Sequence, residues 1–104
     1  MNHKNHNKEI IKKATQSICH YRVAAFGFNK KGELIGKAIN RPRLSKPHGG
    51  LHAEMSLMKH YGNKLASIII CRIGNAGDLR PIKPCTACQA VADYLNIKIR
   101  SITP

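Results

Sequence analysis

Two short motifs on either side of residues 55–83 limit how this chain can fold. The first is His52-Ala53-Glu54, and the second is Pro84-Cys85-Thr86-Ala87-Cys88. One imidazole and two thiolates are ligands that Zn²⁺ prefers, and three protein ligands leave the fourth tetrahedral position open, as catalytic zinc sites do. Glu54 would lie beside the metal, where a carboxylate can take a proton from water and return it to a leaving group. The fold must therefore bring the two motifs together.

Hydrophobic spacing and turn residues predict seven elements. We expect helices over 8–18, from 51 or 52 to 62, and from 84 onward, and strands over 21–28, 33–40, 67–73 and 97–102. The first helix takes its apolar face from Ile10, Ile11, Ala14 and Ile18. The order α-β-β-α-β-α-β predicts a mixed sheet with helices on its faces. We expect one domain over 1–104, with a flexible start at 1–7.

Both motifs fall at predicted helix starts. Cysteines at i and i+3 on a helix point the same way. At a helix N-terminus the exposed amides and the dipole stabilise thiolates, which is the form that binds zinc. His52 opens the preceding helix, and Pro84 suits the entry of the next one because its missing N–H would be unpaired there. The two helix starts can therefore meet at one end of the sheet.

These residues resemble the cytidine deaminase superfamily, in the His/Cys/Cys branch that includes deoxycytidylate deaminases and tRNA adenosine deaminases. Residues 23–25 resemble the small-residue first strand of that family, and 36–40 resemble its second strand, so the match covers 18–102. The resemblance implies a three-layer α/β/α sandwich with zinc as the cofactor. It also implies metal ligands and a catalytic residue at His52, Cys85, Cys88 and Glu54, and substrate contacts at Asn40, Ala53 and Pro84.

The implied activity is hydrolytic deamination of a nucleobase. Cytosine in a (deoxy)cytidine nucleoside or nucleotide is the favoured substrate, and the products would be uracil and ammonia. The alternative is a cytosine or adenine within RNA or single-stranded DNA. The resemblance also implies a homo-oligomer, because small members of the superfamily complete their pockets with neighbouring subunits.

Three other interpretations of these residues compete with that of a zinc-dependent deaminase. A Cys-x-x-Cys pair alone can be redox-active, but a redox role leaves His52 and Glu54 unexplained. A structural zinc module needs a fourth ligand, for which the candidates are His48, His60, Cys19 and Cys71. A basic zinc module that binds nucleic acid without chemistry has no use for Glu54.

The charge balance points to an anionic partner. Eighteen Lys and Arg oppose five acidic residues, which gives a formal net charge of +13. Such a charge favours nucleic acid or a nucleotide phosphate, although basic residues spread over the chain can equally be a solvated surface. Two Phe, three Tyr and no Trp leave few platforms on which single strands could stack. Arg41, Arg43 and Lys46, before the metal helix, could meet a substrate phosphate.

The remaining features concern location. The longest apolar stretch, 68–71, is far too short to span a membrane. The polar start lacks the apolar segment of a secretory signal, so we expect a cytoplasmic protein without a membrane partner. Cys19 and Cys71 lie in apolar runs, and we expect both to be buried free thiols.

Overall fold

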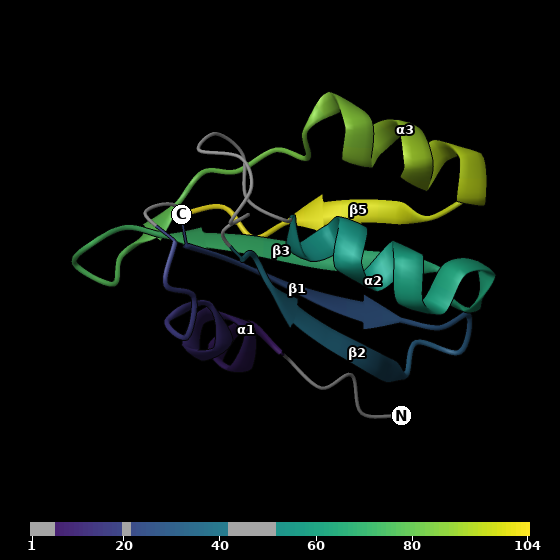
Figure 1. Ribbon diagram of the computed structural model, residues 1–104. Helices are drawn as coiled ribbons and strands as arrows, with labels where there is room; N and C mark the ends of the chain where they lie inside the picture. Colours follow the sequence, from purple (N-terminus) through teal and green to yellow (C-terminus); the bar gives the residue numbers. More distant parts are fainter. Residues whose placement is uncertain (1–5, 20–21, 42–51) are drawn as a thin grey trace.

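The computed structural model describes residues 6–19, 22–41 and 52–104. Its elements, in chain order, are α1 (Asn7–Ala14), β1 (Arg22–Phe28), β2 (Leu34–Ile39), α2 (Ala53–Tyr61), η1 (Gly62–Lys64), β3 (Ser67–Ile73), β4 (Leu79–Arg80), α3 (Thr86–Leu95) and β5 (Lys98–Ser101). The predicted order is confirmed (Figure 1). The 3₁₀ turn η1 and the two-residue strand β4 were not predicted.

The sheet is mixed. β1 pairs antiparallel with β2 on one side and with β3 on the other, so β2 and β3 run parallel across it. β3 pairs along its other edge with β5, in parallel, and with the short β4, antiparallel. Each pair of parallel strands is joined through a helix, α2 or α3, as parallel strands require.

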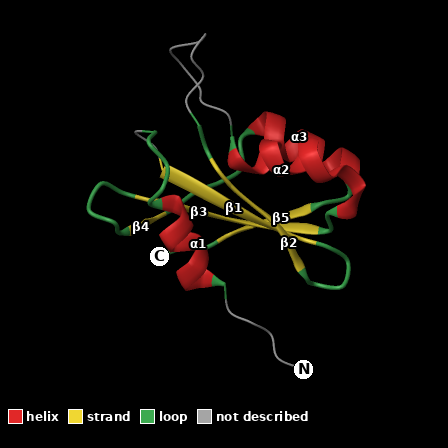
Figure 2. Cartoon of the chain, turned by 60° about the horizontal axis from the view of Figure 1, so that its bottom comes forward, coloured by secondary structure: helices red, strands yellow, loops and turns green. Residues whose placement is uncertain are grey.

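The helices form a layer on each face of the sheet. α1 lies on one face, while α2 and α3 lie together on the other (Figures 1 and 2). Because successive residues of a strand point to opposite faces of the sheet, the strands contribute to two separate cores. Ile10, Phe26 and Cys71 belong to the core under α1, whereas Leu57 and Ile70 belong to the core under α2 and α3. The predicted three-layer α/β/α architecture is therefore confirmed.

Two glycines let α2 approach the sheet closely. Gly27 of β1 lies directly opposite Gly36 of β2. A Cβ atom on Gly27 would come within 2.6 Å of a methyl carbon of Leu65, and one on Gly36 would overlap the ring of Tyr61. Because neither glycine has a side chain, the C-terminal half of α2 and the chain after it can pack onto the strand backbones. This contact fixes the position of the helix that begins beside His52.

The first helix is shorter than predicted. α1 ends at Ala14, and Ile18, which we expected on its apolar face, is 84 % exposed. After Ala14 the backbone hydrogen bonds tighten to a spacing of three residues. The hydroxyl of Ser17 then donates a 2.7 Å hydrogen bond to the side-chain oxygen of Asn40. That bond ties the chain after the helix to the end of β2. Ile10 and Ala14 are buried as expected.

Other boundaries differ by small amounts. Residues 1–5 of the expected flexible start lie outside the described residues, as do 42–51 of the loop before α2. The predicted loop 74–84 contains β4, whose Leu79 packs against the α1-side core. Within the described residues, no helix is long and apolar enough to cross a bilayer.

Candidate metal centre

The backbone places the two motifs at the starts of neighbouring helices. His52 is the N-cap residue of α2, and Cys85 is the N-cap residue of α3. Both have extended backbone angles, but only the side chain of Cys85 caps the exposed amides of its helix, since His52 makes no side-chain cap hydrogen bond. The amide of Cys88 donates to the sulfur of Cys85 at 3.3 Å. Pro84 therefore lies just before the cap rather than at the first helical position, where it was expected.

The three candidate ligands converge. The Nδ1 atom of His52 lies 3.1 Å from the sulfur of Cys85 and 3.4 Å from the sulfur of Cys88. All three ligand atoms lie within 4.8 Å of one another. Zinc–sulfur and zinc–nitrogen bonds of about 2.3 and 2.0–2.1 Å in a tetrahedron separate nitrogen from sulfur by roughly 3.6 Å. The donor set and its spacing therefore fit a zinc ion with three protein ligands.

The described residues supply no fourth protein ligand. The cluster of potential ligands found within 6–19, 22–41 and 52–104 contains His52, Cys85 and Cys88 alone. His60, Cys19 and Cys71, proposed above as candidates for a structural site, are not in it, and His48 lies outside the described residues. A site with three protein ligands is the arrangement found in catalytic zinc centres.

Glu54 lies in the first turn of α2 and is only 4 % exposed. Burying a carboxylate is costly unless something nearby interacts with it. Its charge is felt by Cys88, whose pKa it helps to raise. The carboxylate is thus held inside the protein beside the ligand cluster without being a member of it, and its acid/base role stays a prediction.

The thiol of Cys88 is hard to ionise in the metal-free protein. Burial is the main cause of its raised pKa, and the neighbouring Cys85 and the charge of Glu54 act in the same direction. A cation at the centre would reverse this preference, because zinc binds the thiolate. Zinc binding would therefore have to displace the proton of Cys88.

We expect the affinity for zinc to rise with pH. Since Cys88 keeps its proton at neutral pH without metal, binding must release at least that proton, and the affinity should rise about tenfold per pH unit for each proton released. Competition with a chelator of known affinity between pH 6.5 and 8.5 measures this slope. An affinity that does not change over this range would contradict the prediction.

The two remaining cysteines have different environments. Cys71 is fully buried between α1 and the sheet, and this burial raises its pKa to about 11, so it is a neutral core thiol. Cys19 is only half-buried, which corrects the expectation that both would be buried. All four cysteines, each within the described residues, are free thiols.

The predicted substrate-contacting residues lie around the end of β2 and the two helix starts. The side-chain oxygen of Asn40 accepts hydrogen bonds from the Ser17 hydroxyl and from the Val23 amide, the latter at 2.9 Å. Ala53 is fully buried in the first turn of α2, and Pro84 is half-buried. The contacts of these three residues with a substrate stay predictions. The anchoring of Asn40 by Ser17 was missed, because no local pattern links residues so far apart.

Sequence reasoning did not connect two polar residues on α2 with a pocket: it passed over Ser56 and considered His60 only as a candidate zinc ligand. Ser56 lies one turn after His52, and His60 one turn further along the same side of the helix, a spacing of four residues that the sequence does display. Both line a pocket between α2 and β2 that is described below.

The chain has the fold of the solved cytidine deaminases, and His52, Cys85 and Cys88 form a group that could hold a metal ion. The likeness to solved cytidine deaminases extends over most of the chain. The sequence matches no protein-family model, and it matches no curated protein.

Three solved structures illustrate this likeness. The cytidine deaminase from Mycobacterium leprae is 23 % identical, with a TM-score of 0.62 over 93 % of this chain and 83 % of that one. The enzyme from Burkholderia pseudomallei is 20 % identical, with a TM-score of 0.60 over 92 % and 78 %. The enzyme from Mycobacterium tuberculosis is 17 % identical, with a TM-score of 0.60 over 93 % and 80 %.

Proposed function

We propose that this protein is a zinc-dependent hydrolytic deaminase that converts cytosine, in a (deoxy)cytidine nucleoside or nucleotide, to uracil and ammonia. The observation that supports this most is the buried Glu54 beside a three-ligand cluster at two helix starts. The likeness to solved cytidine deaminases agrees with it. Homo-oligomerisation belongs to the same proposal.

His52, Cys85 and Cys88 would hold the zinc ion. When bound, the ion supplies a Lewis acid that makes water a stronger acid and a better nucleophile. Glu54 accepts a proton from the attacking water as its oxygen bonds to the amine-bearing ring carbon. The same carboxyl group gives this proton to the ring nitrogen, then takes the remaining proton from the hydroxyl group on the ring carbon and passes it to the amine. The C–N bond breaks as the C=O bond forms, so that one water is consumed and one ammonia leaves.

The surroundings of Glu54 suit this proton transfer. The Glu54 carboxylate is only 4 % exposed, so bulk water has little access to it. Its place in the first turn of α2 also fixes the carboxylate relative to His52, two positions earlier. The carbonyl of Ala53 and the backbone around Pro84 would contact the exocyclic amine, and Asn40 would contact the sugar.

A second candidate, deamination of a base within RNA or single-stranded DNA, is favoured by the net charge of +13. Binding of a polynucleotide releases counterions, so log affinity for single strands should fall with log salt at a slope of about −0.7 per phosphate contact. A mononucleotide has one phosphate group, and its KM should respond far less to salt.

The test is a deamination screen of zinc-loaded protein against cytidine, deoxycytidine, their 5′-monophosphates, adenosine and oligonucleotides, at about 50 and 200 mM salt. Turnover of a cytosine nucleoside or nucleotide supports the proposal. Deamination confined to oligonucleotides, with steep loss at the higher salt, would support the second candidate instead. Absence of turnover on every substrate would contradict both.

A further inference from the structure

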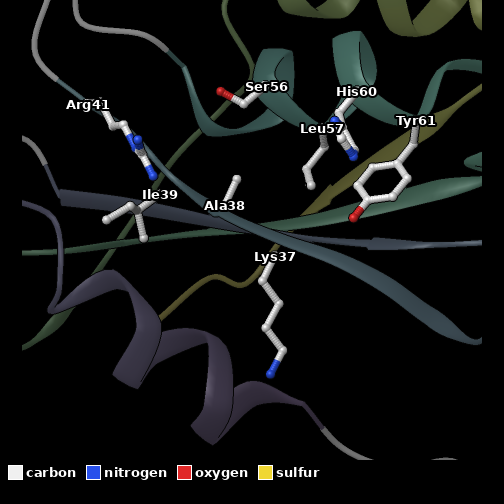
Figure 3. Close-up of a pocket in the computed structure, with 8 residues that line it drawn as sticks. All are labelled: Lys37, Ala38, Ile39, Arg41, Ser56, Leu57, His60 and Tyr61. Carbon is white, nitrogen blue, oxygen red and sulfur yellow. The ribbon is translucent and has the colours of Figure 1, made fainter.

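A pocket of about 360 Å³ lies between α2 and the edge strand β2. Its described lining residues come from the end of β2 and from one side of α2 (Figure 3). Leu57 and Ala38 form an apolar floor, and the ring of Tyr61 closes one end. No Asp or Glu is among the described residues that line the pocket.

Its polar groups suit an anion. Arg41, exposed at the end of β2, turns its guanidinium toward the pocket, and guanidinium groups match phosphate oxygens in geometry as well as charge. The imidazole of His60 and the hydroxyl of Ser56 reach the pocket from successive turns of α2. Lys37 also borders it, but the ammonium group points to the other face of the sheet, where it lies 3.8 Å from Glu9.

The two polar groups on α2, the His60 imidazole and the Ser56 hydroxyl, are held near the pocket by weak contacts. The ring of His60 packs edge-on against Tyr61, with ring centroids 4.5 Å apart, which restrains the imidazole. The Ser56 hydroxyl lies 3.3 Å from the carbonyl oxygen of His52, which is long for an O–H···O bond and therefore weak. An anion in the pocket could replace this weak contact with a charge-assisted one.

The pocket lies further along α2 from the metal cluster. At 1.5 Å per residue, Ser56 lies about 6 Å and His60 about 12 Å along α2 from His52. Arg41 directly follows Asn40, the residue proposed above to contact the sugar. Base, sugar and phosphate could therefore reach the metal, Asn40 and the pocket in turn.

We propose that this pocket binds the phosphate of the substrate, and that the substrate is a cytosine nucleoside monophosphate rather than the nucleoside. The proposal rests on the deaminase function proposed above. Arg41, Ser56 and His60 would then be specificity-determining residues, because the nucleoside would leave their polar groups without an anion.

The test compares Arg41→Gln and His60→Gln with wild type and with Lys59→Gln. Lys59 is exposed on the same helix but does not line the pocket, so its variant controls for the loss of one positive charge. The ratio of kcat/KM for deoxycytidine 5′-monophosphate to that for deoxycytidine should fall about 10- to 100-fold in Arg41→Gln. A smaller fall is expected in His60→Gln, and no change in Lys59→Gln. An unchanged ratio in Arg41→Gln would overturn the proposal.

A second readout does not depend on turnover. Titration with inorganic phosphate or deoxycytidine 5′-monophosphate, followed by NMR, should shift the amide signals of Ser56 and His60 in wild type and Lys59→Gln but not in Arg41→Gln. Absence of these shifts in wild type would overturn the phosphate site even if deamination is observed. Shifts without any deamination would support the site while contradicting the deaminase function. If Arg41→Gln impairs only oligonucleotide binding, the phosphate belongs to a polynucleotide and the mononucleotide proposal fails.

Discussion

Glu54→Gln should abolish nearly all turnover while the protein stays folded and keeps its zinc. The amide has the shape of the carboxylate but cannot accept and return a proton. Removal of a positioned acid/base group typically costs about 10²- to 10⁴-fold in rate. Because Glu54 is buried next to the ligands and is not one of them, we expect the zinc content to stay near one per chain. Turnover and zinc content, measured on the same preparation, check both halves of this prediction.

Asp93→Asn is the matched control for this variant. Asp93 is an exposed carboxylate on α3, the helix that carries Cys88, and it accepts a 2.8 Å hydrogen bond from Gln89. The change also removes one negative charge, so an effect of net charge alone would appear in both variants. Near-native activity of Glu54→Gln would exclude the proposed proton transfer, whatever the substrate.

Cys88→Ala should lose zinc and, with it, much of the stability of the zinc-loaded protein. The ligands join the starts of α2 and α3, so metal binding is coupled to folding. A ligand that binds only the folded state stabilises it by about 4 kcal/mol when its free concentration is a thousand times its Kd. Wild type should therefore unfold at a lower temperature after addition of a chelator, whereas Cys88→Ala should unfold at the same temperature with and without it.

Cys71→Ala separates the loss of zinc from the loss of packing. Cys71 and Cys88 are buried to nearly the same extent, but Cys71 lies on the opposite side of the sheet from the metal cluster. We expect Cys71→Ala to retain one zinc per chain and to respond to chelator as wild type does. A zinc content near zero in wild type purified without chelator would contradict the metal site itself.

The metal cluster could be predicted from the sequence because its determinants are local. The ligand types, the spacing of Cys85 and Cys88 on one turn, and the capping positions all lie within two short motifs. Apolar periodicity likewise identified the buried face of α1 and the central strand β3. These features depend on neighbours along the chain, which a sequence displays directly.

Contacts between distant residues were the part that could not be predicted. The bond from Ser17 to Asn40 joins the chain after α1 to the end of β2, and Ile18 beside it is exposed. The opposed glycines, Gly27 and Gly36, have meaning only once the strands are paired. Likewise, the pocket near Arg41 arises where a strand and a helix meet, so neither segment alone reveals it.

The sulfur of Cys85 has a double role that restricts what else could stand at this position. It accepts a hydrogen bond from the amide of Cys88 and so caps α3, and it also belongs to the metal cluster. Serine would keep the cap but offers a hard oxygen in place of a soft thiolate, and histidine would keep a zinc ligand but is not among the preferred capping residues. Local folding of α3 and metal binding at the centre therefore share one atom, and neither serine nor histidine would preserve both.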